Sequence, residues 1–191
     1  MDMQGSRVLN ATQEQTWQAL NDPDILKACI PGCDKFELAE PNVYAVVVAL
    51  KIGPVAAKFT GKVSLMDIVP PNSYALQFEA QGGIAGFGKG ESKVELKPVE
   101  GGVELSYTVH SQVGGKIAQL GQRLIDGVAK TLAEDFFTRF EEQLIARHGA
   151  SNAEEASTSS QDNAEASGPT PTWIWAFALV IAASAVWFIS K

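Results

Sequence analysis

The sequence predicts an α+β fold in which a curved antiparallel sheet wraps around one long C-terminal helix, an architecture known as the helix grip. Three observations lead to this prediction. Apolar and polar residues alternate through 44–52, 58–65, 73–80 and 101–113, as in strands with one wet face and one covered face. Two short helical segments precede these strands. An apolar stripe of helical period follows them.

The two short helical segments have clear start signals. The first is TQEQTWQALN (12–21), which Asn10 or Thr12 can cap with a side-chain oxygen. The second is DPDILKAC (22–29), where Pro23 occupies the first turn and needs no hydrogen bond from its missing N–H. The segment IPGC then interrupts the helical pattern, so both helices should lie before the main run of strands.

Each alternating run assigns its large apolar residues to one face. In the first run, YAVVVALKI, the face carries Tyr44, Val46, Val48, Leu50 and Ile52. The later runs place Phe59, Val63, Tyr74, Phe78 and Tyr107 in the equivalent phase. Because successive side chains of a strand point to opposite faces, these residues should form the covered side of the sheet.

The cover is a helix predicted from about Gly115 to Arg147. Its apolar residues recur every three or four positions: Ile117, Leu120, Leu124, Val128, Leu132, Phe136, Phe140 and Leu144. A stripe of this kind is typical of a helix that packs against a sheet along its whole length.

Glycines interrupt the covered face in GGIAGFGKGESKVEL (82–96). Gly86, Gly88 and Gly90 share one phase with Val94 and Leu96, so they should face inward and leave space there. A β-bulge, a close backbone crossing or a barrel corner would explain the glycines equally well. If the space stays open, we expect a ligand cavity lined by Val46, Val48, Phe59, Val63, Phe78, Gly86, Phe87, Gly88, Gly90, Tyr107, Leu124 and Val128, of which Phe87 is out of phase with the glycines.

The last part of the chain has a different composition. Residues 150–171 contain no aliphatic residue larger than alanine, which predicts a disordered, acidic linker. The run from Trp173 to Ile189 is free of charge, and about 18 helical residues cover roughly 27 Å of a ~30 Å hydrocarbon core. Trp173, Trp175 and Trp187 stand at its two ends, where indole rings suit the headgroup interfaces. We therefore expect a domain at 1–149 and a transmembrane tail anchor at 172–191.

Composition narrows the function further. The net charge of -7 argues against nucleic acid as a partner, because no basic surface would neutralise phosphates. The N-terminus has no apolar signal segment, so the domain should face the cytoplasm at the inner membrane. Two cysteines, Cys29 and Cys33, do not suggest a disulfide scaffold.

Neither a catalytic site nor a metal site is expected. His110 falls on the wet face of its strand, and His148 lies at the end of the long helix. Cys29 and Cys33 are separated by three residues and have no second cluster that could complete a zinc or iron–sulfur site. Asp67 shares the inward phase of its strand but lies close to Pro70 and Pro71, so we expect it to be exposed.

Four segments carry a family resemblance. They are LNDPDILKACIPGC (20–33), KIGPVAAKFTGKVSL (51–65), GFGKGES (86–92) and, most specifically, VGGKIAQLGQRLIDGVAK (113–130). Together they resemble the G-subunit family of carbon monoxide dehydrogenase, within the START-like superfamily that is also called SRPBCC. The resemblance covers residues 1–148. It implies a hydrophobic cavity that handles a quinone such as menaquinone, and some family members carry a C-terminal membrane anchor.

The resemblance also implies partners. Family members help to bring a molybdenum-containing carbon monoxide dehydrogenase, or another molybdenum hydroxylase, to the cytoplasmic membrane, where electrons enter the respiratory chain. On this hypothesis the chain is not an enzyme and has no covalent cofactor. Two alternatives stay open: an adaptor with a collapsed core and no ligand, and a START-like cyclase or dehydratase that uses Tyr44, Tyr74, Tyr107 or Asp67 inside the hollow.

Overall fold

The structure is a computed structural model that describes residues 1–158, with side chains through Arg147. Residues 1–153 form one compact unit. In chain order the elements are β1 (Asp2–Leu9), α1 (Gln13–Leu20), α2 (Pro23–Cys29), β2 (Cys33–Glu40), β3 (Val43–Ile52), β4 (Val55–Val69), β5 (Ser73–Gln81), the 3₁₀ turn η1 (Gly83–Ala85), β6 (Phe87–Val99), β7 (Gly102–Gly114), the 3₁₀ turn η2 (Ala118–Leu120) and α3 (Gln122–Thr158).

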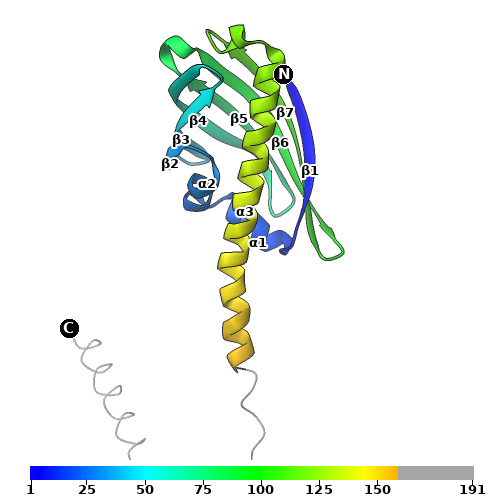
Figure 1. Ribbon diagram of the computed structural model, residues 1–191. Helices are drawn as coiled ribbons and strands as arrows, with labels where there is room; N and C mark the ends of the chain where they lie inside the picture. The colour runs from blue at the N-terminus through cyan, green and yellow to red at the C-terminus, as the bar shows by residue number, and fades with distance from the viewer. Residues whose placement is uncertain (159–191) are drawn as a thin grey trace, which may run out of the picture. The chain divides into compact units, whose positions relative to one another are not determined.

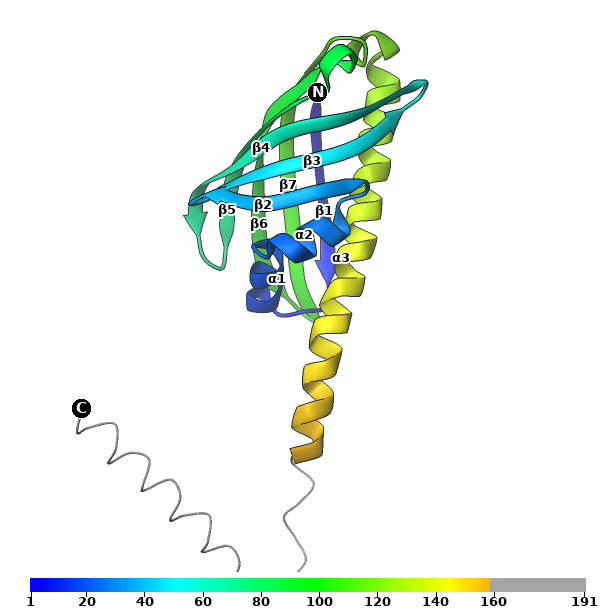
Figure 2. The same ribbon diagram turned by 90° about the vertical axis from the view of Figure 1, so that its left-hand side faces the viewer.

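Within the described residues, seven strands form a single antiparallel sheet in the order β1-β7-β6-β5-β4-β3-β2. Neighbours in the chain pair as hairpins from β2 to β7, and β1 closes the far edge against β7. The sheet curves around α3, while α1 and α2 lie near one end of the sheet (Figures 1 and 2). The predicted helix-grip fold is confirmed.

Caps explain where the two short helices begin. Thr12 accepts a hydrogen bond from the Gln15 N–H, and the Gln15 side chain accepts one from the Thr12 N–H, so Thr12 and not Asn10 is the cap. Asp22 caps α2 and also accepts a hydrogen bond of 2.7 Å from Arg147 on α3. Arg147 lowers the pKa of Asp22. The same carboxylate thus starts α2 and ties it to the long helix.

The long helix begins later than its apolar pattern suggests. We expected it from about Gly115, but α3 starts at Gln122 after the turn η2. Gly115 and Gly121 have φ angles of +83° and +90°, which a regular helix does not allow. Ile117 is still buried, because the non-helical segment turns it toward Phe59 and Ala85. At the other end, α3 continues to Thr158, beyond the boundary of 149 drawn from composition.

The core of the domain lies in two clusters. The larger one joins α1, α2 and the C-terminal half of α3 to the sheet, with Leu9, Trp17, Val103, Phe137 and Phe140 among its buried members. The smaller one contains Phe59, Ala85 and Ile117. Most apolar residues of β3 lie outside both clusters and are only half-buried. Close packing therefore stops before the whole covered face of the sheet is filled.

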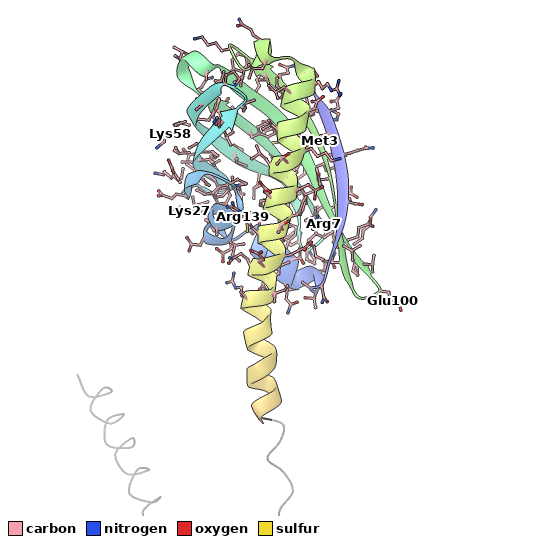
Figure 3. All side chains as sticks on the ribbon, viewed as in Figure 1. Met3, Arg7, Lys27, Lys58, Glu100 and Arg139 are labelled. Carbon is pink, nitrogen blue, oxygen red and sulfur yellow. The ribbon has the colours of Figure 1, made fainter. Side chains whose placement is uncertain are left out.

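Charged contacts hold α3 against β1. The guanidinium group of Arg7 donates to Glu141 at 2.6 Å and to Glu134 at 3.0 Å, and it lies 6.0 Å from the centre of the Phe137 ring. Figure 3 shows Arg7 on β1 beside α3. The hydrogen bond to Glu141 is the main cause that raises the pKa of Arg7. Together with the Asp22–Arg147 pair, this contact fixes the helix across the concave side of the sheet.

No helix within residues 1–158 is long and apolar enough to cross a membrane. The predicted linker beyond Thr158 and the predicted tail anchor, with Trp173, Trp175 and Trp187, lie outside the described residues.

Candidate ligand cavity between the sheet and the long helix

Two adjoining apolar cavities lie between the sheet and α3. The inner cavity has a volume of about 330 Å³ and the outer cavity one of about 460 Å³. Five residues line both of them: Ile30, Val63, Phe78, Ala133 and Phe136. Because the two spaces share these walls, they lie next to each other under the helix, and we refer to them together as the hollow.

The inner cavity lies beside the larger core cluster. Its lining comes from α1, α2, the inner faces of β2 to β7, and α3: Leu20, Leu26, Phe36, Tyr44, Leu65, Tyr74, Leu76, Ser92, Val94, Leu105, Tyr107 and Phe137, besides the shared residues. Polar atoms enter through the three tyrosines and Ser92. This half of the hollow therefore has an aromatic wall with a few hydroxyl groups.

The outer cavity is almost wholly apolar, with aliphatic side chains in the majority. Its lining is Pro31, Val46, Val48, Leu50, Ile52, Phe59, Gly61, Ala80, Gly88, Ile117 and Leu132, with Lys62 and Glu79, besides the shared residues. The Lys62 and Glu79 side chains pair with each other at 3.2 Å and are more than half exposed. Their charges therefore lie on the wet face of the sheet, and the cavity itself offers apolar surface.

Seven of the predicted lining residues come together here. Val46, Val48, Phe59 and Gly88 line the outer cavity, Tyr107 lines the inner cavity, and Val63 and Phe78 line both. Period-two alternation assigned these positions to one face, and the structure places them beside the cavities because β3, β5 and β7, and β4 as far as its irregularity after Met66, keep that face toward α3.

The three glycines of the predicted hollow have different roles. A Cβ at Gly88 would meet no atom within 4 Å, so this position does open the outer cavity. At Gly90 the Phe78 ring fills the space, lying 2.8 Å from where a Cβ would be, and the backbone oxygen of His110 is closer still. Gly86 precedes β6 and is packed against the backbone of Gly114 and Gly115. Gly86 is therefore a close backbone crossing, one of the alternatives left open by the sequence.

The remaining predicted residues line neither of the two cavities. Phe87 is 38% exposed and lies over Gly114 on the outer side. Leu124 is 39% exposed and packs near Gly53 in the β3–β4 turn. Val128 is half-buried one helical turn further on. Both Leu124 and Val128 lie within α3, but the wall is built one to two turns later by Leu132, Ala133 and Phe136.

Several wall residues were not identified from the sequence. Ile30 and Pro31 come from the segment between α2 and β2, which has no periodicity that would mark it as a wall. Ala133 lies beside Leu132 and Phe136, and its short side chain leaves room below the helix. In the sequence, the small size of Ala133 next to the apolar stripe was the one signal that could have identified this position as part of the wall.

The reactive side chains elsewhere are poorly suited to chemistry. His110 is exposed and pairs with Asp2 at 2.5 Å, and Asp67 is exposed as well. Burial raises the pKa of Cys29 to about 11 and also raises the pKa of Cys33, so both are neutral thiols at pH 7. Among the described residues, no group of three His, Cys, Asp or Glu side chains could hold a metal ion. His148 lies beyond the described side chains.

Comparisons with known proteins agree with the fold. A solved structure of a conserved protein from Geobacillus kaustophilus is 36% identical, with a TM-score of 0.73, and the match covers 76% of this chain and 96% of that one. The structure of TTHA0849 from Thermus thermophilus, 14% identical, has a TM-score of 0.59 over 77% and 99% of the two chains. Protein CV1439 from Chromobacterium violaceum, 15% identical, has a TM-score of 0.56 over 75% and 96%.

No curated protein matches the chain by sequence. The family model for CoxG, the G subunit of carbon monoxide dehydrogenase, matches residues 5–145, which include every strand but the start of β1 and all of the cavity wall. This chain therefore belongs to the CoxG family.

Proposed function

We propose that this chain is a non-catalytic accessory protein that holds a quinone in the hollow between sheet and helix. In this function it presents the quinone to a carbon monoxide dehydrogenase, or to another molybdenum hydroxylase, at the cytoplasmic face of the membrane. Membership of the CoxG family supports the accessory role beside a carbon monoxide dehydrogenase. The quinone is the part of the proposal that rests on the geometry of the chain.

The observation that supports quinone binding is the apolar hollow itself. Its two parts, of about 330 and 460 Å³, fall in the range of small-molecule sites, which are mostly apolar with a few polar groups. Close packing is the rule inside proteins, so an unfilled apolar space of this size destabilises the domain unless a ligand occupies it. A collapsed adaptor core would have closed this space, as Phe78 closes it over Gly90.

A quinone is the acceptor that needs such a carrier. Its isoprenoid chain loses about 0.8 kcal/mol for each CH₂ that moves from the bilayer into water, so a soluble enzyme cannot draw it out unaided. An apolar hollow takes over that burial. The redox chemistry would belong to the partner enzyme and its cofactors, and this chain would supply binding and location.

The cavity is not well suited to an enzyme of the same fold. Its ionisable side chains are tyrosines, because Lys62 and Glu79 point to the wet face. Burial raises the pKa of Tyr74, and it also raises the pKa of Tyr107, so neither is a base at neutral pH. A cyclase or dehydratase needs a paired acid and base, which the walls of the hollow lack.

We further propose that residues 172–191 anchor the chain in the inner membrane, with the domain on the cytoplasmic side. Ending the chain at Thr158 should leave a folded domain that stays in the supernatant when membranes are pelleted. The complete chain should pellet and resist a carbonate wash, because its charge-free run from Trp173 to Ile189 is long enough to span. Circular dichroism checks that the shortened chain is folded. Pelleting of the folded short chain with washed membranes would contradict the anchor.

The function is tested by purifying the complete chain from native membranes and identifying what comes with it. Mass spectrometry of an organic extract should show a quinone at close to one molecule per chain, and the protein fraction should contain a molybdenum hydroxylase. A chain that carries only bulk phospholipid, from membranes rich in quinone, would overturn the carrier function.

A further inference from the structure

Tyr74 is a polar residue held deep in the inner cavity. Its side chain comes from β5, lines the cavity and is 6% exposed. None of the side-chain hydrogen bonds among residues 1–147 involves its hydroxyl. Among the described side chains, the Thr16 hydroxyl is the polar group that has neither accessible surface nor a hydrogen-bond partner. The Tyr74 hydroxyl is not sealed in this way, so it opens onto the cavity it lines.

Packing fixes the direction of this side chain. The Trp17 ring meets the Tyr74 ring edge to face, with centroids 5.7 Å apart, and Val94 is its cross-strand neighbour. Both neighbours belong to the tightly packed core cluster, so the ring has little freedom to turn away. The hydroxyl is therefore positioned before any ligand arrives, which lowers the entropy lost on binding.

The hydroxyl of Tyr107 points in a different direction from that of Tyr74. Its ring also lines the inner cavity, but its hydroxyl lies over Gly5 on β1, 2.7 Å from where a Cβ of that residue would be. Its ring packs on Phe137. Burial is the main cause that raises the pKa of Tyr107, and the nearby Glu134 on α3 raises it further. The Tyr107 hydroxyl thus faces the β1 edge, and Tyr74 is the deeper polar group.

The protonation state makes Tyr74 a hydrogen-bond donor. Burial, and next the nearby Tyr44, raise its pKa above the ordinary value for tyrosine. The phenol is therefore neutral throughout the physiological range and presents an O–H to the cavity. Water can pair this donor in the empty cavity, but a ligand that displaces the water leaves the O–H unpaired unless it brings an acceptor oxygen of its own.

We propose that the Tyr74 hydroxyl donates a hydrogen bond to a carbonyl oxygen of the bound ligand. This sets the ligand's orientation: the carbonyl-bearing head lies in the inner cavity, and its apolar chain runs through the outer cavity past Gly88. The inference rests on the proposed function and makes it specific, because it assigns the recognition of a quinone head to one side chain. Apolar molecules without an acceptor would fit the hollow but leave the donor unpaired.

A matched pair of ligands tests the hydrogen bond. Menadione carries two carbonyl oxygens on the ring system of 2-methylnaphthalene, which has none. Calorimetric titration uses the complete chain in lipid nanodiscs, with empty nanodiscs as the blank. The wild-type chain should bind menadione more tightly than the hydrocarbon. Tyr74→Phe keeps the ring against Trp17 and should weaken menadione binding about three- to tenfold, the usual effect of one neutral hydrogen bond. The hydrocarbon, which leaves the Tyr74 donor unpaired in the wild type, should bind the variant at least as tightly as before.

The other outcomes distinguish a failure of the Tyr74 hydrogen bond from a failure of the proposed quinone-binding function. Equal losses for both ligands in Tyr74→Phe would mean that the substitution disturbed packing, and they would overturn the hydrogen bond. Unchanged menadione affinity in the variant would overturn it as well, while leaving the apolar hollow as the quinone site. If the wild-type chain bound neither compound, the ligand function itself would fail, and the role of Tyr74 with it.

Discussion

Replacing Gly88 by phenylalanine is expected to weaken quinone binding by at least about tenfold while the domain keeps its fold. Gly88 lies on β6 and lines the outer cavity, and a Cβ added there would meet no atom within 4 Å, so a side chain would start in open space and project into that cavity. A benzyl group and an apolar ligand cannot occupy that space together. Titration with a quinone that carries a short isoprenoid chain measures the loss, and menadione, which has no such chain and occupies the inner cavity, should lose less affinity.

A glycine away from the hollow provides the matched control. A Cβ at Gly127, on an exposed turn of α3, also meets nothing within 4 Å, so Gly127→Phe adds the same group without filling a cavity. It should bind quinone as the wild type does. Gly90→Phe is not a useful substitute, because it would collide with the Phe78 ring and the His110 backbone and damage the sheet. Undiminished affinity in a folded Gly88→Phe chain would place the ligand outside the outer cavity.

Removing the ring of Phe140 should lower the free energy of unfolding by about 3–5 kcal/mol. Phe140 is fully buried and stacks on Phe136 at a centroid distance of 5.6 Å, so alanine there leaves a void where α3 meets the sheet. Equilibrium urea unfolding of residues 1–158 measures the change. Ile145→Ala, on the same helix but 65% exposed, should stay within about 0.5 kcal/mol of wild type. A loss below about 1 kcal/mol for Phe140→Ala would mean that this part of the helix does not anchor the fold.

Much of the fold follows from local pattern. Alternation identified the inward faces of β3, β5 and β7, because each keeps one side toward the helix along its length, and that of β4 as far as the register shift after Met66. The caps of α1 and α2 were visible because Thr12 and Asp22 act on residues two or three positions away. Local signals were sufficient wherever the interaction that decides the structure is itself local.

The interior of the hollow depended on contacts that a single strand does not encode. Gly88 and Gly90 look alike in the sequence, yet Phe78 is the cross-strand partner of Gly90 and fills the space above it. Ala80 pairs with Gly88, and its small side chain leaves the space open. Predicting this difference requires the register between β5 and β6, which period-two alternation alone does not give.

The predicted start of the long helix was wrong for a related reason. Ile117 and Leu120 continue the apolar spacing of α3, but they belong to a non-helical connection bounded by two glycines with positive φ. The apolar spacing is similar in a 3₁₀ turn and an α-helix over so few residues. Separately, the wall of the cavity is formed by Leu132 and Phe136 and not by Leu124 and Val128, which lie earlier on the same stripe.

The most direct test of the carrier account measures electron flow from the dehydrogenase to membrane quinone in the presence of Gly88→Phe. The variant should remain in the membrane and still bind the enzyme, and the enzyme should keep its full activity with a soluble dye. We predict that quinone reduction falls at least about tenfold, because location without an open apolar hollow cannot bring the quinone out of the bilayer. Normal quinone reduction, with the hollow shown to be blocked, would contradict the carrier and leave a protein that only anchors its partner.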